Sequence, residues 1–219
     1  HKAFNEEFQG RIDDRGESLE APLIDGAPPV LIQGQGKTSK IYRAKTAEGD
    51  VYFKPFGGVN SLRPRREVLT SRVNDMFGLE LVPKTRFGSS EITVFGGETK
   101  IVKGSVQEGV KTPPFKQGSL EMEHSLLNDP KYANSLSNLR AFDYILASGD
   151  RHYENLFVDE KTGKIMAIDN EDSFGSVIPL ATTDKPLSGG ILPDKYTSEF
   201  IHTLANLTPE KEQLSFYLL

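Results

Sequence analysis

Residues 149–155 read Gly-Asp-Arg-His-Tyr-Glu-Asn, and residues 168–170 read Ile-Asp-Asn. Asp150 and Asn155 are five positions apart, and Asp169 follows Asn155 by fourteen. Phosphoryl transfer needs one carboxylate near the attacking hydroxyl, and an amide with a second carboxylate to hold metal on the phosphates of ATP. The two stretches therefore predict a catalytic loop in which Asp150 orients the acceptor hydroxyl or accepts its proton. Asn155 and Asp169 are the predicted metal ligands.

The segments around this loop have a pattern that brings these side chains together. Residues 156–158 and 165–167 are apolar and flank a Lys-Thr-Gly-Lys turn, which predicts a β-hairpin. Asp169 lies at the end of the second strand, so we expect its carboxylate at the same site as Asn155. A helix is predicted before the loop, over about residues 136–147. Its apolar face would consist of Leu136, Leu139, Phe142, Ile145 and Leu146.

Two features near the loop are open to more than one interpretation. His152 could act as the base, or Arg151 and His152 could brace the loop, which is the commoner role of a loop histidine. Residues 172–175 read Asp-Ser-Phe-Gly, a loose match to the Asp-Phe-Gly metal motif with one extra residue. We therefore favour Asp169 as the main Mg²⁺ ligand and leave Asp172 as a second ligand or a helix cap.

A glycine-rich turn lies upstream, where residues 34–39 read Gly-Gln-Gly-Lys-Thr-Ser between two predicted strands. Glycines allow backbone N–H groups to approach phosphates closely, so Gly34, Gly36 and Ser39 are predicted to cover the phosphates of a nucleotide. An ordinary hairpin turn explains the same stretch equally well. A P-loop is excluded, because it requires glycine where this chain has Leu31, and because the next segment predicts a strand instead of a helix.

Lys54 ends an apolar strand that is predicted over residues 51–54. An ammonium group at this place can lie over the α- and β-phosphates of ATP, provided that a carboxylate fixes it. Glu67 on the following helix is the candidate, although a glutamate in a first helical turn is also common for reasons of the helix dipole. We expect Lys54 to be partly solvated, so that Lys54→Ala abolishes catalysis with little loss of folding stability.

The rest of the chain predicts strands, then a linker, then helices. A helix is predicted over about residues 65–77, stopped by Gly78, and another begins near residue 208. Residues 109–119 form a Pro- and Gly-containing linker that could serve as a hinge. Six short stretches have strand character: 30–32, 40–44, 51–54, 85–87, 91–95 and 100–105.

These residues, taken as an ordered set over about residues 30–175, resemble the atypical kinases of the phosphatidylinositol 3/4-kinase-like group and the compact bacterial effector kinases related to them. The stretch at 149–155 is similar to the Gly-Asp-Arg-His-x-x-Asn of that group. Residues 167–170 resemble the metal-binding segment of type II phosphatidylinositol 4-kinases. Four more segments resemble parts of that group. Residues 53–55 resemble the lysine strand, 66–68 the helix glutamate, 81–85 the next strand and 104–107 the entry to the hinge.

The resemblance implies an α+β, bilobal protein-kinase-like fold with a reduced C-lobe. The expected organisation is a polar lead-in over 1–29, an N-lobe over 30–108 and a small C-lobe over 109–219. ATP is the expected cofactor, with Mg²⁺ or Mn²⁺. Only 44 residues follow Gly175 and no Ala-Pro-Glu motif closes an activation segment, so substrate docking is expected to be unusual or to use parts of the protein outside this sequence.

The resemblance favours a protein serine/threonine kinase of the bacterial effector type, acting on a host signalling or cytoskeletal protein. A phosphoinositide kinase is the first alternative. Lipid kinases need a basic membrane-facing patch, whereas residues 170–200 contain two lysines against five acidic side chains. A pseudokinase scaffold is the second alternative, disfavoured because all five expected catalytic and metal-binding side chains are present: Lys54, Glu67, Asp150, Asn155 and Asp169.

The composition limits the remaining classes. The chain has 219 residues and a net charge of −5, which gives no electrostatic footprint for nucleic acid. The absence of cysteine excludes disulfides, thiol nucleophiles and thiolate zinc sites. No apolar run approaches the length of a membrane span. The first residue is His1 instead of Met, so we expect an excised domain. The expected location is the host-cell cytoplasm after secretion if the effector resemblance holds, and otherwise the cytoplasm.

Overall fold

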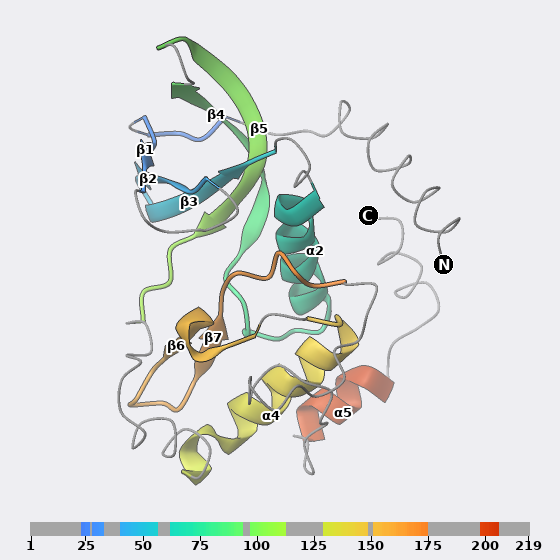
Figure 1. Ribbon diagram of the computed structural model, residues 1–219. Coiled ribbons are helices and arrows are strands. Elements are labelled where there is room, and N and C mark those ends of the chain that lie inside the picture. Colours follow the sequence, from blue (N-terminus) through green and yellow to red (C-terminus); the bar gives the residue numbers. More distant parts are fainter. Residues whose placement is uncertain are drawn as a thin grey trace, which may run out of the picture.

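A five-stranded antiparallel sheet forms one part of the protein (Figure 1). The computed structural model describes residues 23–26, 28–32, 40–56, 62–93, 97–112, 129–148, 151–174 and 198–205. The strand order is β1-β2-β3-β5-β4, and the predicted combination of a sheet with helices is confirmed. The strands are β1 (Val30–Leu31), β2 (Tyr42–Thr46), β3 (Gly49–Pro55), β4 (Thr85–Thr93) and β5 (Thr99–Glu108).

Strand β3 lies in the middle of this sheet and is the strand that positions Lys54. It pairs with β2 on one side and with β5 on the other, where Lys54 is opposite Ser105. Successive side chains of a strand point to opposite faces. Phe53 is fully buried in the apolar cluster on one face, so Lys54 projects from the other. The apolar cluster contains Ile24, Tyr42, Ala44, Val51, Phe53, Ile92 and Val106.

Helix α2 (Leu62–Met76) packs against the part of the sheet formed by β4 and β5. It begins three residues before the predicted start, since Pro64 lies in its first turn, where proline is tolerated. The predicted stop at Gly78 is confirmed: this residue has a φ of 64°, a conformation that glycine adopts without steric cost. The buried apolar side chains of this segment include Val68, Leu69, Val73 and Phe77.

A second apolar cluster joins α2 to the segments around the predicted catalytic loop. These segments are α4 (Pro130–Ile145), a short 3₁₀ turn (Tyr153–Asn155), and the hairpin of β6 (Leu156–Val158) and β7 (Ile165–Ala167). The hairpin has the predicted bounds, and Ala167 donates its N–H to the carbonyl of Leu81, at 2.7 Å. Helix α2 therefore packs against the sheet and also belongs to the apolar cluster that contains the hairpin. The cluster includes Leu69, Val73, Phe77, Leu136, Leu139, Phe142, Leu156 and Ile165.

Several predicted boundaries were wrong. Residues 85–93 form one strand, not two, because the pairing with β5 runs without interruption through Gly88, Ser89 and Ser90. Helix α4 begins at Pro130, six residues early, where the Asp129 carboxylate caps the N–H of Lys131.

Other segments also differ from the prediction. Ile145, expected on the apolar face of α4, is exposed. Leu23 forms a bridge with Ser89 of β4, and Ile24 is buried, so the end of the polar lead-in contacts the sheet. Helix α5 (Ser198–Ala205) was not predicted. The helix predicted from residue 208 lies outside the described residues, as do residues 113–119 of the linker; residues 109–112 form neither helix nor strand.

Gly104 on β5 allows the close approach of β3. A Cβ atom there would lie 2.2 Å from the carbonyl oxygen of Lys54 and 2.7 Å from Cε2 of Phe53. We therefore expect Gly104→Ala to push the two strands apart, with a loss of folding free energy of about 1–3 kcal/mol. Urea denaturation measures this loss, and Thr99→Ala, at an exposed position of β5, is the control. Equal midpoints for the two variants would contradict the expectation.

Candidate active site

Three carboxylates surround the ammonium group of Lys54. Its Nζ atom lies 2.6 Å from Oε1 of Glu67, 2.9 Å from Oδ1 of Asp169 and 3.4 Å from Oε2 of Glu171. Glu67 comes from α2, while Asp169 and Glu171 follow β7. The structure therefore brings together Lys54, Glu67 and Asp169, three residues that the sequence predicted for one site.

The lysine and its helix partner are almost completely buried. Lys54 is 6% exposed and Glu67 is 2% exposed, and the hydroxyl of Ser105 donates to the second carboxylate oxygen of Glu67, at 3.2 Å. Burial by itself lowers the pKa of Lys54, but the carboxylates of Glu67, Asp169 and Glu171 outweigh it and raise this pKa above its usual range. Lys54 is therefore a buried, protonated cation. The expectation that it would be partly solvated was wrong, because the strand carries it beneath α2.

The pKa of Glu67 is governed first by its burial, which raises it, while the adjacent Lys54 ammonium acts in the opposite direction. A buried carboxylate of this kind is costly without its cation. Glu67 and Lys54 are therefore stable in this position only together. Their ion pair links β3 to α2.

Asp169 differs from Glu67 in exposure and in backbone conformation. Its side chain is 40% exposed, and its φ of 57° lies in the left-handed region, which is uncommon for residues other than glycine. Such outliers persist where the surrounding structure fixes them, often at functional sites. Here the fixing contacts are on both sides: Ile168 donates its N–H to the carbonyl of Asn155, and the guanidinium of Arg151 binds the carbonyl of Ile168 and Oδ1 of Asn170.

Arg151 is a buried brace for the loop, the role that the sequence analysis left open for it together with His152. It binds both carboxylate oxygens of Asp143 on α4, at 2.9 and 3.0 Å, and Oδ1 of Asn170 at 2.6 Å. Together with its bond to Ile168, these contacts join α4, the loop and the segment that holds Asp169. Arg151 is 2% exposed and Asp143 is 6% exposed.

Removing this brace is expected to destabilise the protein strongly. Arg151→Met leaves the Asp143 carboxylate buried without its cation, which typically costs about 3–5 kcal/mol of folding free energy. The double variant Arg151→Met, Asp143→Leu should recover much of this loss, because it removes both charges together. Chemical denaturation of the two variants measures the difference. An Arg151→Met variant as stable as the unchanged protein would contradict the bracing role of Arg151.

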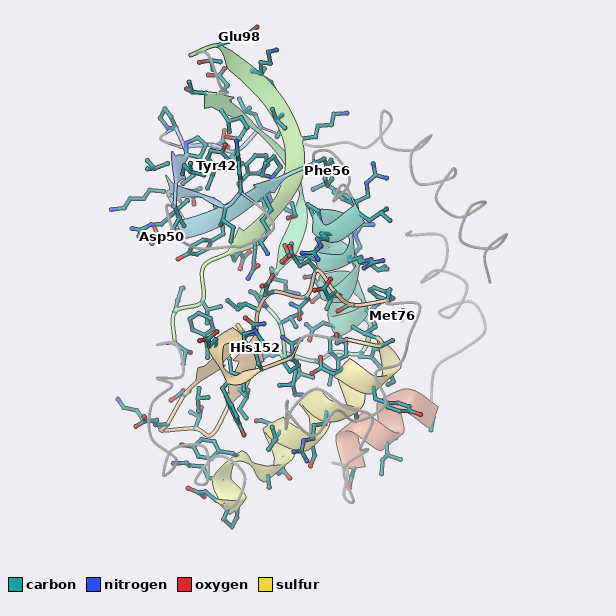
Figure 2. All side chains as sticks on the ribbon, in the orientation of Figure 1. Tyr42, Asp50, Phe56, Met76, Glu98 and His152 are labelled. Carbon is teal, nitrogen blue, oxygen red and sulfur yellow. The ribbon has the colours of Figure 1, made fainter. Side chains whose placement is uncertain are left out.

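His152 and Asn155 contact each other within the loop, and Figure 2 shows His152 near the β6–β7 hairpin. Nδ2 of Asn155 lies 3.2 Å from Nε2 of His152. An amide nitrogen can only donate, so Nε2 of His152 is the acceptor in this contact. The contact orients the Asn155 amide, which favours the bracing role of His152 over the role of a base.

Glu171 was missed as a site residue by the sequence analysis. It is 4% exposed, contacts Lys54, and accepts a 2.7 Å hydrogen bond from Nη1 of Arg63 on α2. Asp172, predicted as a second ligand or a cap, lies 3.4 Å from Nη2 of the same arginine. The signal in the sequence was the acidic run after Asp169, in which no pattern distinguishes the buried Glu171 from the half-buried Asp172.

Four of the predicted site residues, namely Gly34, Gly36, Ser39 and Asp150, lie outside the described residues. Their roles, like those of Lys54, Glu67, His152, Asn155 and Asp169, stay predictions.

The residues present fit a divalent cation with oxygen ligands. Glu67, Asp169 and Glu171 each offer a carboxylate oxygen, all within 4.8 Å of one another. Mg²⁺ is usually bound by one or two carboxylates together with substrate phosphates and water. Glu67 and Glu171 are buried against Lys54, whereas Asp169 is accessible. Asp169 is thus the carboxylate best placed for such an ion, with the amide of Asn155 as the predicted second ligand.

A comparison with protein families matches residues 116–217 to the family of phosphatidylinositol 3- and 4-kinases. The match spans just under half of the chain. It includes the segment with Asn155 and Asp169, and it begins after Lys54 and Glu67, which the fold brings next to Asp169. No curated protein matches the chain, so no individual effector kinase is supported. The family match, which agrees with the predicted resemblance, supports a kinase: the chain is an enzyme of phosphoryl transfer.

None of the helices in the described ranges has both the length and the apolar character needed to cross a membrane.

Proposed function

We propose that this chain is a bilobal, kinase-like phosphotransferase that transfers the γ-phosphoryl group of ATP to a hydroxyl group. One observation carries the proposal: Lys54 of β3 lies between Glu67 of α2 and Asp169, which follows β7. The three residues are far apart in the sequence and come from three elements. A buried lysine between a helix carboxylate and a metal-binding carboxylate is the arrangement that phosphoryl transfer by kinases requires.

Each residue has a distinct part in the proposed reaction. Lys54 binds the α- and β-phosphates, and Glu67 holds its ammonium group in place. Asp169 and Asn155 would hold Mg²⁺ or Mn²⁺, which would neutralise charge on the phosphates. Asp150 orients the acceptor hydroxyl, and the contact between His152 and Asn155 keeps the amide directed to the metal. Catalysis then rests on positioning and electrostatic stabilisation of the transferred group.

For the acceptor we propose serine or threonine of a protein. The sequence of residues 170–200 contains Lys185 and Lys195 against five acidic side chains, a balance that opposes docking on anionic lipid. The resemblance to bacterial effector kinases extends the proposal to a host signalling or cytoskeletal protein, with action in the host cytoplasm after secretion.

A phosphoinositide acceptor is the second candidate, and the family match favours it. The matched family is described by its action on phosphatidylinositol, and the match includes the proposed metal-binding segment. The two candidates share the catalytic residues and differ only in the acceptor.

Radiolabelled ATP distinguishes the two acceptors. The protein is incubated with Mg²⁺ or Mn²⁺ and [γ-³²P]ATP, with casein and histone in one series and phosphatidylinositol vesicles in the other. Label in phosphoserine or phosphothreonine supports the proposed protein kinase. Label in the lipid fraction alone would replace it by a lipid kinase. Asp169→Asn is the inactive control in both series.

A further inference from the structure

Glu171 connects the lysine of the site to the first turn of α2. One of its carboxylate oxygens lies 3.4 Å from Nζ of Lys54, and the other accepts from Nη1 of Arg63, at 2.7 Å. Glu171 is 4% exposed, and the side chain of Arg63 is 24% exposed. Because Glu171 lies two residues after Asp169, the same contacts also join the predicted metal-binding segment to α2.

The three carboxylates around Lys54 cannot all keep their present partner when nucleotide and metal bind. A lysine ammonium group has three N–H donors, and Glu67, Asp169 and Glu171 face it here. In the proposed reaction Asp169 would serve the metal, and one donor of Lys54 would serve the phosphates. Glu67 and Glu171 are then the two carboxylates that remain to hold the lysine.

We infer that Glu171 is a positioning residue, which together with Arg63 fixes Lys54 and the first turn of α2 when Asp169 is taken up by the metal. This inference rests on the proposed function. Glu67 alone ties Lys54 to the middle of α2, whereas the bond from Glu171 to Arg63 ties the start of that helix to the segment after β7. Loss of Glu171 therefore leaves Asp169 and Lys54 present but less well aligned for transfer.

The test compares Glu171→Gln with Arg63→Met, Arg63→Lys and the control Glu98→Gln. The side chain of Glu98 is 66% exposed and lies at the far end of the β4–β5 pair, remote from His152 (Figure 2). We expect Glu171→Gln to lower kcat on the order of 10- to 100-fold, the range of one charge-assisted hydrogen bond, with a much smaller change in KM for ATP. Arg63→Met should lower kcat in the same direction, and Arg63→Lys should restore most of it because the charge is kept.

Two further readouts separate positioning from other roles. Hydrogen exchange should become faster in the first turn of α2 in Glu171→Gln and Arg63→Met, and stay unchanged in the control. The Mg²⁺ concentration for half-maximal activity should be the same in Glu171→Gln and the unchanged protein. A large rise in this concentration in Glu171→Gln, without a rise in Arg63→Met, would overturn the inference, because Glu171 would then be a metal ligand.

The remaining outcomes are also decisive. If Glu171→Gln matches the control in both kcat and hydrogen exchange, the inference is wrong and the proposed function stands. If the unchanged protein transfers no phosphate to any acceptor, the proposed function fails. Hydrogen exchange in α2 then still decides whether Glu171 and Arg63 fix that helix.

Discussion

Lys54→Ala is expected to lower the rate of phosphoryl transfer on the order of 10²–10³-fold or more, the usual cost of losing one electrostatic contact with the transition state. Lys54 is the cation that the structure places between Glu67 and Asp169, and no other residue of the described ranges occupies that position. Steady-state kinetics with radiolabelled ATP measure the loss. A well-folded Lys54→Ala variant with near-normal turnover would refute the assignment.

The same substitution should also destabilise the fold, unlike the removal of an exposed lysine. It leaves the buried Glu67 carboxylate, beside Asp169 and Glu171, without its cation, which typically costs about 3–5 kcal/mol. The double variant Lys54→Met, Glu67→Gln should be more stable than Lys54→Met, yet equally inactive. Urea denaturation measures the stabilities, and this comparison separates the loss of activity from the loss of folding.

Asp169→Ala and Asp150→Ala are both expected to abolish turnover, for different reasons. Asp169 is accessible and adjacent to Lys54, so its loss should weaken the metal-dependent binding of ATP as well as transfer. Asp150 should act only on the acceptor hydroxyl, so its loss should spare ATP binding and remove transfer. Calorimetry of ATP with Mg²⁺ measures the binding of each variant.

The reverse pattern would contradict these roles. If Asp150→Ala lost affinity for ATP with Mg²⁺ while Asp169→Ala kept it, the two roles would have to be exchanged or abandoned. Asp75→Ala is the matched control: its side chain is exposed and pairs with Lys84, outside the site. It should keep nucleotide binding close to that of the unchanged protein.

Much of the site was predictable from the sequence because it depends on local order. The hairpin has a clear turn between two short apolar strands, and its bounds were correct, so Asp169 could be placed at its end. Lys54 was predicted from its place at the end of an apolar strand, and Glu67 from its place near the start of the next helix. Their pairing at 2.6 Å requires only that α2 cross the face of the sheet that is opposite to Phe53.

The rest depends on contacts between distant segments. Burial of Lys54 arises from three carboxylates that approach from two parts of the chain, and sequence alone treats a lysine as a solvated side chain. The bond from Glu171 to Arg63 spans 108 positions, and no local pattern indicates it. The continuity of β4 through Ser89 and Ser90 is imposed by β5, because small polar residues by themselves suggest a break.

Transfer of label from [γ-³²P]ATP, compared between the unchanged protein, Asp169→Asn and Glu98→Gln, tests the central claim most directly. The three are incubated with Mg²⁺ and with both protein and phosphatidylinositol acceptors, and the label in each acceptor is counted. We expect transfer by the unchanged protein and by Glu98→Gln, and none above background by Asp169→Asn. Equal transfer by all three, or no transfer by the unchanged protein to either class of acceptor, would contradict it.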